Sequence, residues 1–393
     1  MPASDSRRDP LTAVVAVGLC TFLGILPSNI IPFQIGVLVD ACGLSELQAS
    51  FIGTSEIAAV AVTAILVSPF VHRVSHSKCA IAGICVAAAA QVISMLVSSF
   101  APLLICRLLA GVGLGLVYAA ATSAGAAAIN PDRMYGVAQG MALALAAPLY
   151  ALMGIVGARG GQFAYFLVCT ILILAVFPAC RWLDFDGALA LPQSGPRGFT
   201  LRSGMVLGLI TVLFNLGLSP IWAFVERVGV NLHLGKDRVG LLLSIAGAAG
   251  VAGSLTASRV GSRVARRPVL ILAFIFAAAS GASTMSGLSV PLWGIGAFVY
   301  VYTFSFIYPY LLAVGADLDS SGRLNTALVG MGMIANSFGP LIGGILATEG
   351  SYARVGVFCT ALCLSVIVLL MFSGQLLRPR ARSDEGDLAH VSG

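Results

Sequence analysis

Long apolar runs, separated by short polar segments, follow one another from residue 12 to residue 374 and leave few folds open to this chain. A helix that crosses a bilayer needs ~20 mostly apolar residues, because the hydrocarbon core is ~30 Å thick and each residue rises ~1.5 Å. The runs are too long for strands and show no two-residue alternation. They predict an all-α membrane protein with twelve transmembrane helices, near residues 12–36, 48–70, 79–99, 102–126, 134–157, 162–182, 203–225, 238–258, 268–288, 291–315, 324–347 and 353–374.

Composition indicates that lipid is the solvent for most of the chain. The sequence is 58% hydrophobic and only 10% charged, whereas a soluble domain carries about 25% charged residues. The net charge of +6 does not indicate nucleic-acid binding, because the basic residues form short clusters between apolar runs. We therefore expect membrane lipid, and no nucleic acid, among the partners.

The basic residues also predict an orientation. If the N-terminus lies inside, sixteen Lys and Arg residues fall in inside segments and five in outside loops, while Arg107 lies within a span. Inside loops of membrane proteins carry the excess of basic residues. The sequence therefore predicts a multi-pass protein of the cell's inner (plasma) membrane, with both termini in the cytoplasm.

The longest polar interruption divides the spans into six and six. It covers residues 184–202 and carries Pro192, Gly195, Pro196 and Gly198, which are typical of a linker. The predicted organisation is an N-terminal tail (1–11), a six-helix bundle (12–183), a cytoplasmic linker (184–202), a second six-helix bundle (203–375) and a C-terminal tail (376–393).

The two halves resemble each other in sequence. Arg73 lies in the loop after the second span and Arg259 in the loop after the eighth, and each precedes a valine and a small residue. Pro148 and Pro340 occupy corresponding positions in the fifth and eleventh spans. Because six spans is an even number, both halves keep one orientation. This is the parallel duplication of transporters built from two six-helix, pseudo-symmetric halves.

The repeated loop resembles a motif of the major facilitator superfamily. That motif has a small residue, three spacers, Asp-Arg, a spacer, Gly and then basic residues. In the segment Ser68–Lys78, Arg73 and Lys78 match, whereas His72 replaces the Asp and Ser75 the Gly. The loop after the eighth span holds the second copy, with Arg259 and Arg263. These four basic residues are the candidates for the conformational loop motif.

Three spans add to the resemblance. The fourth reads RLLAGVGLG from Arg107 to Gly115, similar to the family's intramembrane arginine followed by spaced glycines. The fifth and eleventh resemble its Gly-Pro motif. We expect close helix packing or a bend at Gly111, Gly115, Pro148, Gly339, Pro340 and Gly343.

The resemblance implies a fold and a mechanism. Members of this superfamily rock two six-helix bundles about a central cavity, which the first, fourth, seventh and tenth helices line. In efflux members the intramembrane arginine is associated with proton coupling. The short chain and short linker look most like the twelve-helix drug:proton antiporter branch.

Two charged residues fall well inside predicted spans, away from the span ends. Glu56 lies roughly 12 Å below the outer boundary and Arg107 roughly 8 Å, and a lone charge there costs at least ~2.5–3.5 kcal/mol. We hypothesise that they approach within ion-pair range and serve as the proton-coupling site. The alternatives are a purely structural pair, or pairing of Arg107 with Asp40 at the outer end of the first span.

Polar and aromatic residues of three spans are candidates for the substrate cavity. Broken spans near Pro27 and Pro32 would expose polar groups to cargo, and aromatic rings with hydroxyl groups suit an apolar or aromatic compound. Ordinary packing and an interfacial belt are the alternative. The i, i+2 spacing in the tenth span means that its rings cannot all share one helix face. The candidates are Asn29, Gln34, Asn215, Trp222, Tyr300, Tyr302, Phe304 and Tyr308.

The predicted function is secondary active transport by alternating access: proton-coupled efflux of a small, mostly apolar organic compound. Proton-coupled uptake by the same fold is the alternative, and a membrane-embedded receptor or enzyme is a more remote one. We expect no catalytic residues, cofactor or metal: Cys359 and Cys363 have no His or acid nearby in the sequence, and His76 is expected in a solvated loop. The expected partners are lipid, the transported compound and protons, with the chain acting as a monomer.

Overall fold

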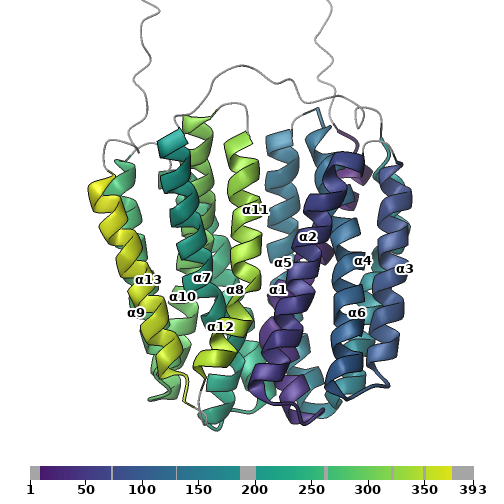
Figure 1. Cartoon of the computed structure of the whole chain (residues 1–393), viewed down its shortest axis with the longest axis horizontal. Coiled ribbons are helices and arrows are strands. Elements are labelled where there is room, and N and C mark those ends of the chain that lie inside the picture. The colour runs from purple at the N-terminus through teal and green to yellow at the C-terminus, as the bar shows by residue number, and fades with distance from the viewer. Residues whose placement is uncertain are drawn as a thin grey trace, which may run out of the picture.

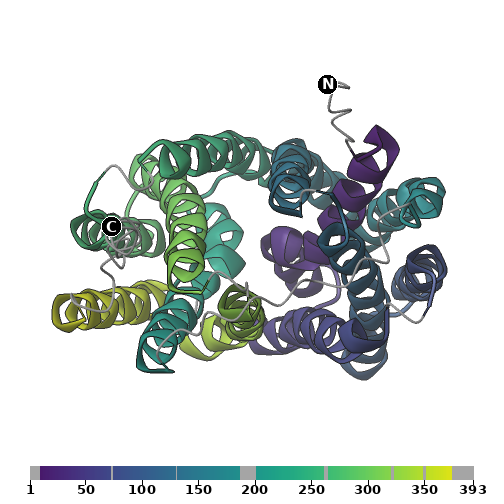
Figure 2. The ribbon, with the colours of Figure 1, turned by 90° about the horizontal axis from the view of Figure 1, so that it is seen from above.

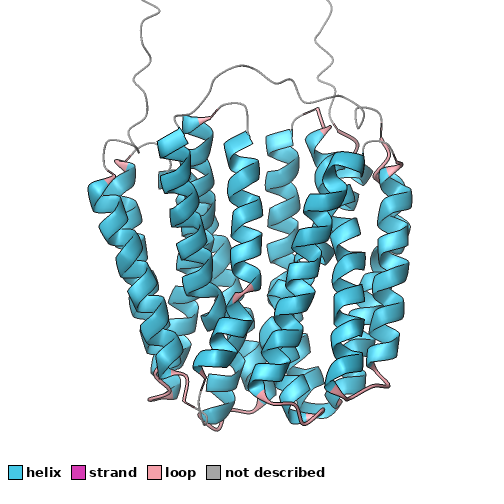
Figure 3. Cartoon of the chain, in the orientation of Figure 1, coloured by secondary structure: helices cyan, strands magenta, loops and turns pink. Residues whose placement is uncertain are grey.

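The computed structural model describes residues 9–71, 74–129, 131–185, 201–260, 264–319, 323–347 and 351–373. Within these ranges, twelve helices are long and apolar enough to cross a membrane (Figures 1 and 3). This confirms the prediction of an all-α, twelve-helix membrane protein. The helical elements are α1 (Leu11–Asp40), α2 (Glu46–Val71), α3 (His76–Ser94), α4 (Phe100–Ala126), α5 (Pro131–Arg159), α6 (Gly161–Val176), η1 (Phe177–Trp182), α7 (Leu201–Asn231), α8 (Lys236–Val260), α9 (Arg266–Met285), α10 (Val290–Leu318), α11 (Arg323–Ser337), α12 (Gly339–Leu346) and α13 (Ala353–Phe372).

The helices form two groups, seen from above in Figure 2. Elements α1 to η1 pack mainly on one another and form the N-half, and α7 to α13 form the C-half. The halves meet chiefly through α5 with α8, α12 and α11 with α2, and α1 with α7. We call the face where α1 begins and α13 ends the terminal face, at the top of Figure 1, and the opposite one the distal face.

Two helices continue beyond their predicted ends on the distal face. The first reaches Asp40 instead of residue 36, and the seventh reaches Asn231 instead of residue 225. Their last turns carry charged residues, which an apolar-run criterion assigns to a loop. Neighbouring helices supply partners for several of these charges, so the backbone stays helical. Asp40, Glu226 and Arg227 therefore lie on helices.

Prolines leave carbonyl groups free for neighbouring helices, because a proline at position i cannot donate to the carbonyl of residue i−4. In α10, Pro309 leaves the Ser305 carbonyl without its helical donor, and Ser254 of α8 donates its hydroxyl to that oxygen at 3.1 Å. Side-chain donors of this kind are what makes prolines tolerable in membrane helices.

The eleventh span breaks in two at Phe338. Pro340 leaves the Asn336 carbonyl free, and the Ser219 hydroxyl of α7 donates to it at 2.7 Å. Gly339 packs against the same serine. The chain then continues as α12. The corresponding proline, Pro148, lies inside the continuous helix α5.

Glycines bring helices into close contact. Gly111 and Gly115 of α4 lie directly against the α2 backbone, at the carbonyl groups of Glu56 and Val60. Across the halves, Gly154 of α5 faces Gly240 of α8 so closely that a β-carbon on Gly154 would stand 2.7 Å from the Gly240 α-carbon. Both contacts need the absence of a side chain.

Candidate functional site

A buried ion pair joins α2 and α4 in the N-half. Arg107 Nη1 lies 3.4 Å from Glu56 Oε1, and the two residues are only 1% and 2% exposed. The prediction that these residues lie within ion-pair range is confirmed. The close contact of Gly111 with the Glu56 backbone sets the spacing of the two helices.

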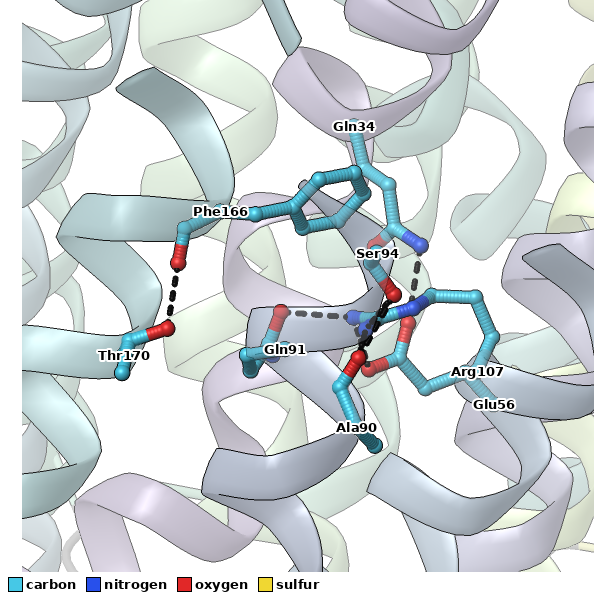
Figure 4. A network of polar contacts seen from close by, with 8 residues as sticks. All are labelled: Gln34, Glu56, Ala90, Gln91, Ser94, Arg107, Phe166 and Thr170. Atoms are coloured by element: carbon cyan, nitrogen blue, oxygen red, sulfur yellow. Dashed lines mark hydrogen bonds and ion pairs between the residues drawn. The ribbon is translucent and has the colours of Figure 1, made fainter. Parts of the chain in front are cut away.

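Arg107 has further partners on α3, shown in Figure 4. Its guanidinium donates to Gln91 Oε1 at 2.9 Å, to Ser94 Oγ at 2.7 Å and to the Ala90 carbonyl at 3.3 Å. The Phe166 ring of α6 covers it, with the ring centroid 4.6 Å from the guanidinium carbon. A guanidinium cannot deprotonate here and needs several acceptors. Arg107 is therefore held by α3 as well as by Glu56.

Gln34 of α1 completes this network. Its Nε2 donates to Glu56 Oε2 at 2.8 Å, so each carboxylate oxygen of Glu56 has a different partner. Gln34 is a predicted cavity residue, and the structure places it among buried polar groups (Figure 4). The network thus connects α1 to α2, α3 and α4 through one titratable side chain.

Aromatic rings form a continuous ladder at the contact between the halves. On α10, Tyr300 stacks on Phe304 and Phe304 on Tyr308, each with 6.3 Å between centroids, and Trp222 of α7 stacks on Tyr300 at 6.3 Å. Their i, i+4 spacing puts the three α10 rings on one helix face. Tyr302 lies on another face.

The ladder continues into the N-half through two residues that are not among the candidates selected from the sequence. The Tyr150 ring of α5 lies 5.2 Å from that of Trp222, and the Phe33 ring of α1 lies 6.3 Å from that of Tyr150. The Tyr150 hydroxyl donates to Asn29 Oδ1 at 3.4 Å, while Asn29 Nδ2 is buried with no hydrogen-bond partner. Asn29 therefore offers a free donor next to the ladder.

Trp222 also links the halves by a hydrogen bond that depends on a proline. Pro32 cannot donate to the Ser28 carbonyl, and Trp222 Nε1 donates to this oxygen at 3.0 Å and to the Asn29 carbonyl at 3.2 Å. The proline of α1 thus creates an acceptor for the C-half.

We expect Trp222→Phe to weaken the contact between the halves about fivefold. It keeps a ring in the ladder but removes a hydrogen bond worth about 1 kcal/mol. Spin-label distances between the halves would measure the shift. Trp293→Phe is the matched control, because Trp293 Nε1 donates at 3.0 Å to the Val225 carbonyl within the C-half. An equal shift in both variants would contradict this interpretation.

Asn215, the remaining cavity candidate, is buried on α7. Its Nδ2 donates to the Thr211 carbonyl of its own helix at 2.8 Å, and its side chain faces Gly332 of α11. Its neighbour Phe214 stacks on Phe304, with 5.1 Å between centroids. The structure thus brings Phe214, and not the amide of Asn215, into contact with the ladder.

A charged cluster closes the distal face between the halves. Asp40 of α1 pairs with Arg227 of α7 at 2.8 Å and with Lys236 of α8 at 2.7 Å. Glu46 of α2 lies 3.6 Å from Arg227 and accepts a hydrogen bond from the Tyr352 hydroxyl. Asp40 therefore does not compete for Arg107. All five residues lie at or beyond predicted span ends, where sequence alone does not show which residues of different helices meet.

The loop-motif candidates are only partly described. Arg73 and Arg263 lie outside the described residues, while Lys78 and Arg259 are exposed. At the start of α9, Arg266 pairs with Asp317 of α10.

The expectation that His76 is solvated is wrong. It is the first residue of α3 and 4% exposed, with Nε2 3.1 Å from Ser123 Oγ and Nδ1 3.4 Å from Asp184 Oδ1. Asp184 also accepts from Ser75. The carboxylate and the α4 hydroxyl hold the imidazole in place of water.

One pocket of about 520 Å³ lies away from these residues, at the distal end of the C-half between the end of α7 and the start of α13. None of the predicted cavity residues lines it. Over the described ranges, no group of three or more His, Cys, Asp or Glu side chains is arranged to hold a metal ion.

No protein-family model and no curated protein matches this sequence. Solved structures do match. A variant of the nucleoside transporter NupG superposes with a TM-score of 0.70 at 12% identity, over 93% of this chain and 100% of that one. The human organic anion transporter MFSD10 (TETRAN) gives 0.66 at 17%, over 92% and 100%, and a D-xylose-proton symporter gives 0.69 at 14%, over 91% and 97%. The chain therefore has the twelve-helix fold of major facilitator superfamily transporters.

Proposed function

We propose that this protein is a secondary active transporter that works by alternating access and exports a small, mostly apolar organic compound in exchange for protons. The observation that carries the proposal is the buried Glu56–Arg107 pair, placed within one half of a two-half helical fold. A titratable group inside a membrane protein is a functional-site hypothesis by default. Here it is tied by hydrogen bonds to α1, which contacts the other half.

The contacts between the halves support a cycle that closes and opens the distal side. The charged pairs of Asp40, the close contact of Gly154 with Gly240, and the hydrogen bond from the Leu341 amide to Thr54 Oγ1 (2.9 Å) all lie between the distal face and the middle of the helices. This arrangement is that of a distal-closed state. Alternating access requires these contacts to break while the contacts within each half persist.

Proton coupling follows from what protonation would do at Glu56. A neutral Glu56 no longer attracts the guanidinium, which keeps Gln91 and Ser94 as partners on α3. Loss of this ion pair weakens the connection of α3 and α4 to α2. The neutral Glu56 is also a weaker hydrogen-bond acceptor for Gln34 of α1. Protonation would therefore change how α1 packs against the rest of the N-half.

The aromatic ladder supports the choice of cargo. Stacked rings favour flat or apolar compounds, and the unpaired amide of Asn29 and the hydroxyl of Tyr308 add polar contacts beside them. The proteins with similar folds carry a nucleoside, organic anions and a sugar. We therefore place the cargo among small organic molecules with an aromatic or apolar body. Protons, lipid and this compound are the proposed partners of a monomer.

Uptake by proton symport is the second candidate, because one protein with this fold is a proton symporter. Proteoliposomes decide between the two without knowledge of protein orientation. With an acid interior, an antiporter accumulates a compound inside; with an acid exterior, a symporter does. A panel of uncharged aromatic compounds avoids the passive trapping of weak bases, and protein-free liposomes are the control. ATP-dependent transport that survives collapse of the proton and sodium gradients would exclude both candidates.

We also propose that both termini are cytoplasmic in the inner membrane, and native Cys42 tests this. The thiol is half-buried between α1 and α2, outside the spans, and burial raises its pKa to about 11. An impermeant maleimide added to intact cells should label this thiol. The labelling rate should rise about tenfold for each unit of pH increase between pH 7 and 9, because the thiolate is the nucleophile. Cys42→Ser should abolish this labelling. Labelling of Cys42 only in inside-out vesicles would reverse the topology.

A further inference from the structure

A second buried carboxylate lies at the contact between the halves. Glu226 of α7 is 1% exposed, and its Oε2 is buried without a hydrogen-bond partner. The carboxylate packs on α1 at Gly36, where a β-carbon would stand 2.7 Å from Oε2. A larger residue than glycine at this position would occupy the space of the carboxylate.

Charged groups surround Glu226 but pair with one another. Arg227 of α7 and Lys236 of α8 both bind Asp40 of α1, and Arg227 also lies near Glu46 of α2. Tyr352, the residue before α13, donates its hydroxyl to Glu46. Over the described residues, no Lys, Arg or His nitrogen lies within 4.0 Å of a Glu226 oxygen. The nearby cations are thus committed to other carboxylates in this state.

The first helix lies between this carboxylate and the Glu56 network. Gln34 binds Glu56 and Gly36 contacts Glu226. Gln34 and Gly36 are two positions apart, which corresponds to a rotation of about 200° around the helix and a rise of about 3 Å along it. The two acids therefore face opposite sides of α1 at nearly the same depth, and only Glu226 is covered by a contact that breaks when the halves separate.

An ionised carboxylate that is buried without partners is unfavourable, whereas the protonated acid tolerates this environment. When α1 moves away from α7, Glu226 meets water from the distal side. The same movement separates Asp40 from Arg227 and Lys236 and leaves these cations available to an ionised Glu226. Burial of Glu226 and closure of the distal face are one event.

We propose that Glu226 is a second proton-binding site, which takes a proton from distal-side water when the halves close and returns it when they open. The inference rests on the alternating access of the proposed function. In the closing step an O–H bond forms at the Glu226 carboxylate with a proton from water, and opening reverses it. Because the closed state holds one more proton than the open state, raising the pH favours opening.

Spin-label distances in nanodiscs test this without any substrate. Leu47→Cys of α2 and Leu288→Cys of the α9–α10 loop place exposed labels on the distal ends of the two halves. The background replaces Cys42, Cys79 and Cys85 with serine, and the other cysteines are buried. We expect the open-to-closed ratio of the otherwise unchanged protein to rise up to tenfold per pH unit for one linked proton.

Glu226→Gln, which mimics the protonated acid, should reduce the slope of the logarithm of that ratio against pH by about one. Asp237→Asn is the matched control, because Asp237 is an exposed carboxylate near the distal end of α8. It should leave the slope unchanged. An unchanged slope in Glu226→Gln would overturn the inference, but it would not contradict the proposed proton-coupled transport. An open-to-closed ratio that does not depend on pH in the unchanged protein would also overturn the inference.

A second variant leaves Glu226 in place. The methyl group of Gly36→Ala would overlap the buried position of the carboxyl group, so the carboxyl group must shift and the pH dependence of the open-to-closed ratio should change. An unchanged pH dependence would contradict the assignment of the linked proton to this carboxyl group. The pH slope of the open-to-closed ratio can depend on Glu226 even if imposed pH gradients drive no transport. That combination would contradict the proposed function but support Glu226 as a proton-binding site.

Discussion

Glu56→Gln is expected to abolish proton-driven accumulation, with a loss of about 100-fold or more, while substrate-for-substrate exchange persists. The amide keeps the size of the side chain and can still bind Gln34, but it cannot take up or release a proton. Its attraction for Arg107, now 3.4 Å from the carboxylate, is also lost. The measurement is uptake in proteoliposomes of any compound that the unchanged protein moves under a pH gradient, compared with exchange at equal pH.

Two arginine variants separate a proton switch from a structural pair. Arg107→Ala leaves Glu56 buried without its cation, which favours the protonated acid, so coupling should be lost as in Glu56→Gln. Arg107→Lys keeps the charge but cannot reach the acceptors of Gln91 and Ser94 together, because it lacks the planar fork. It should restore coupling only in part. Unchanged pH-dependent transport in Glu56→Gln would exclude the pair as the coupling site.

Gly154→Leu is expected to prevent closure of the distal face. A β-carbon at this position would stand 2.6 Å from the Lys236 carbonyl oxygen and 2.7 Å from the Gly240 α-carbon. Both are backbone atoms, which cannot rotate away as a flexible side chain can. The distal ends of α5 and α8 must therefore separate, and we expect the open state to dominate and transport to stop. Spin-label distances between the distal ends of the halves would show the change.

The control for this variant lies one turn further along the same helix. At Gly157, the nearest atoms to a β-carbon are 3.8 and 3.9 Å away, which is ordinary van der Waals contact. Gly157→Ala should therefore leave the distance distribution and transport unchanged. A Gly154→Leu protein that closes normally would show that the α5–α8 contact is not required for the distal-closed state.

Much of the fold could be predicted from the sequence, because the bilayer itself imposes the rule. A segment in lipid must satisfy its own backbone, so long apolar runs become helices, and their number and approximate position follow. The same physics predicted the pairing of Glu56 with Arg107. Each charge is too costly to stay alone in an apolar span, and each is the other's nearest opposite charge among the spans of the N-half.

Residues at span ends were harder to place. Glu226 and Arg227 come just after the predicted end of the seventh span, where a loop and a last helical turn look alike in sequence. The structure continues the helix to Asn231, because Asp40 of α1 neutralises Arg227 there. Whether a charged residue ends a helix depends on whether another helix supplies its partner.

From the sequence alone follow the twelve membrane helices, and also which charges inside the spans must find partners. Which helix faces meet is visible only in the packed structure. In the structure, Gln34 is a hydrogen-bond partner of Glu56 and His76 is buried. Tyr150 and Phe33 belong to the same aromatic ladder as Trp222. A helix's own residues set its polarity and most of its length. Its rotation and depth against another half are set by packing over many residues far apart in the chain, which local sequence does not encode.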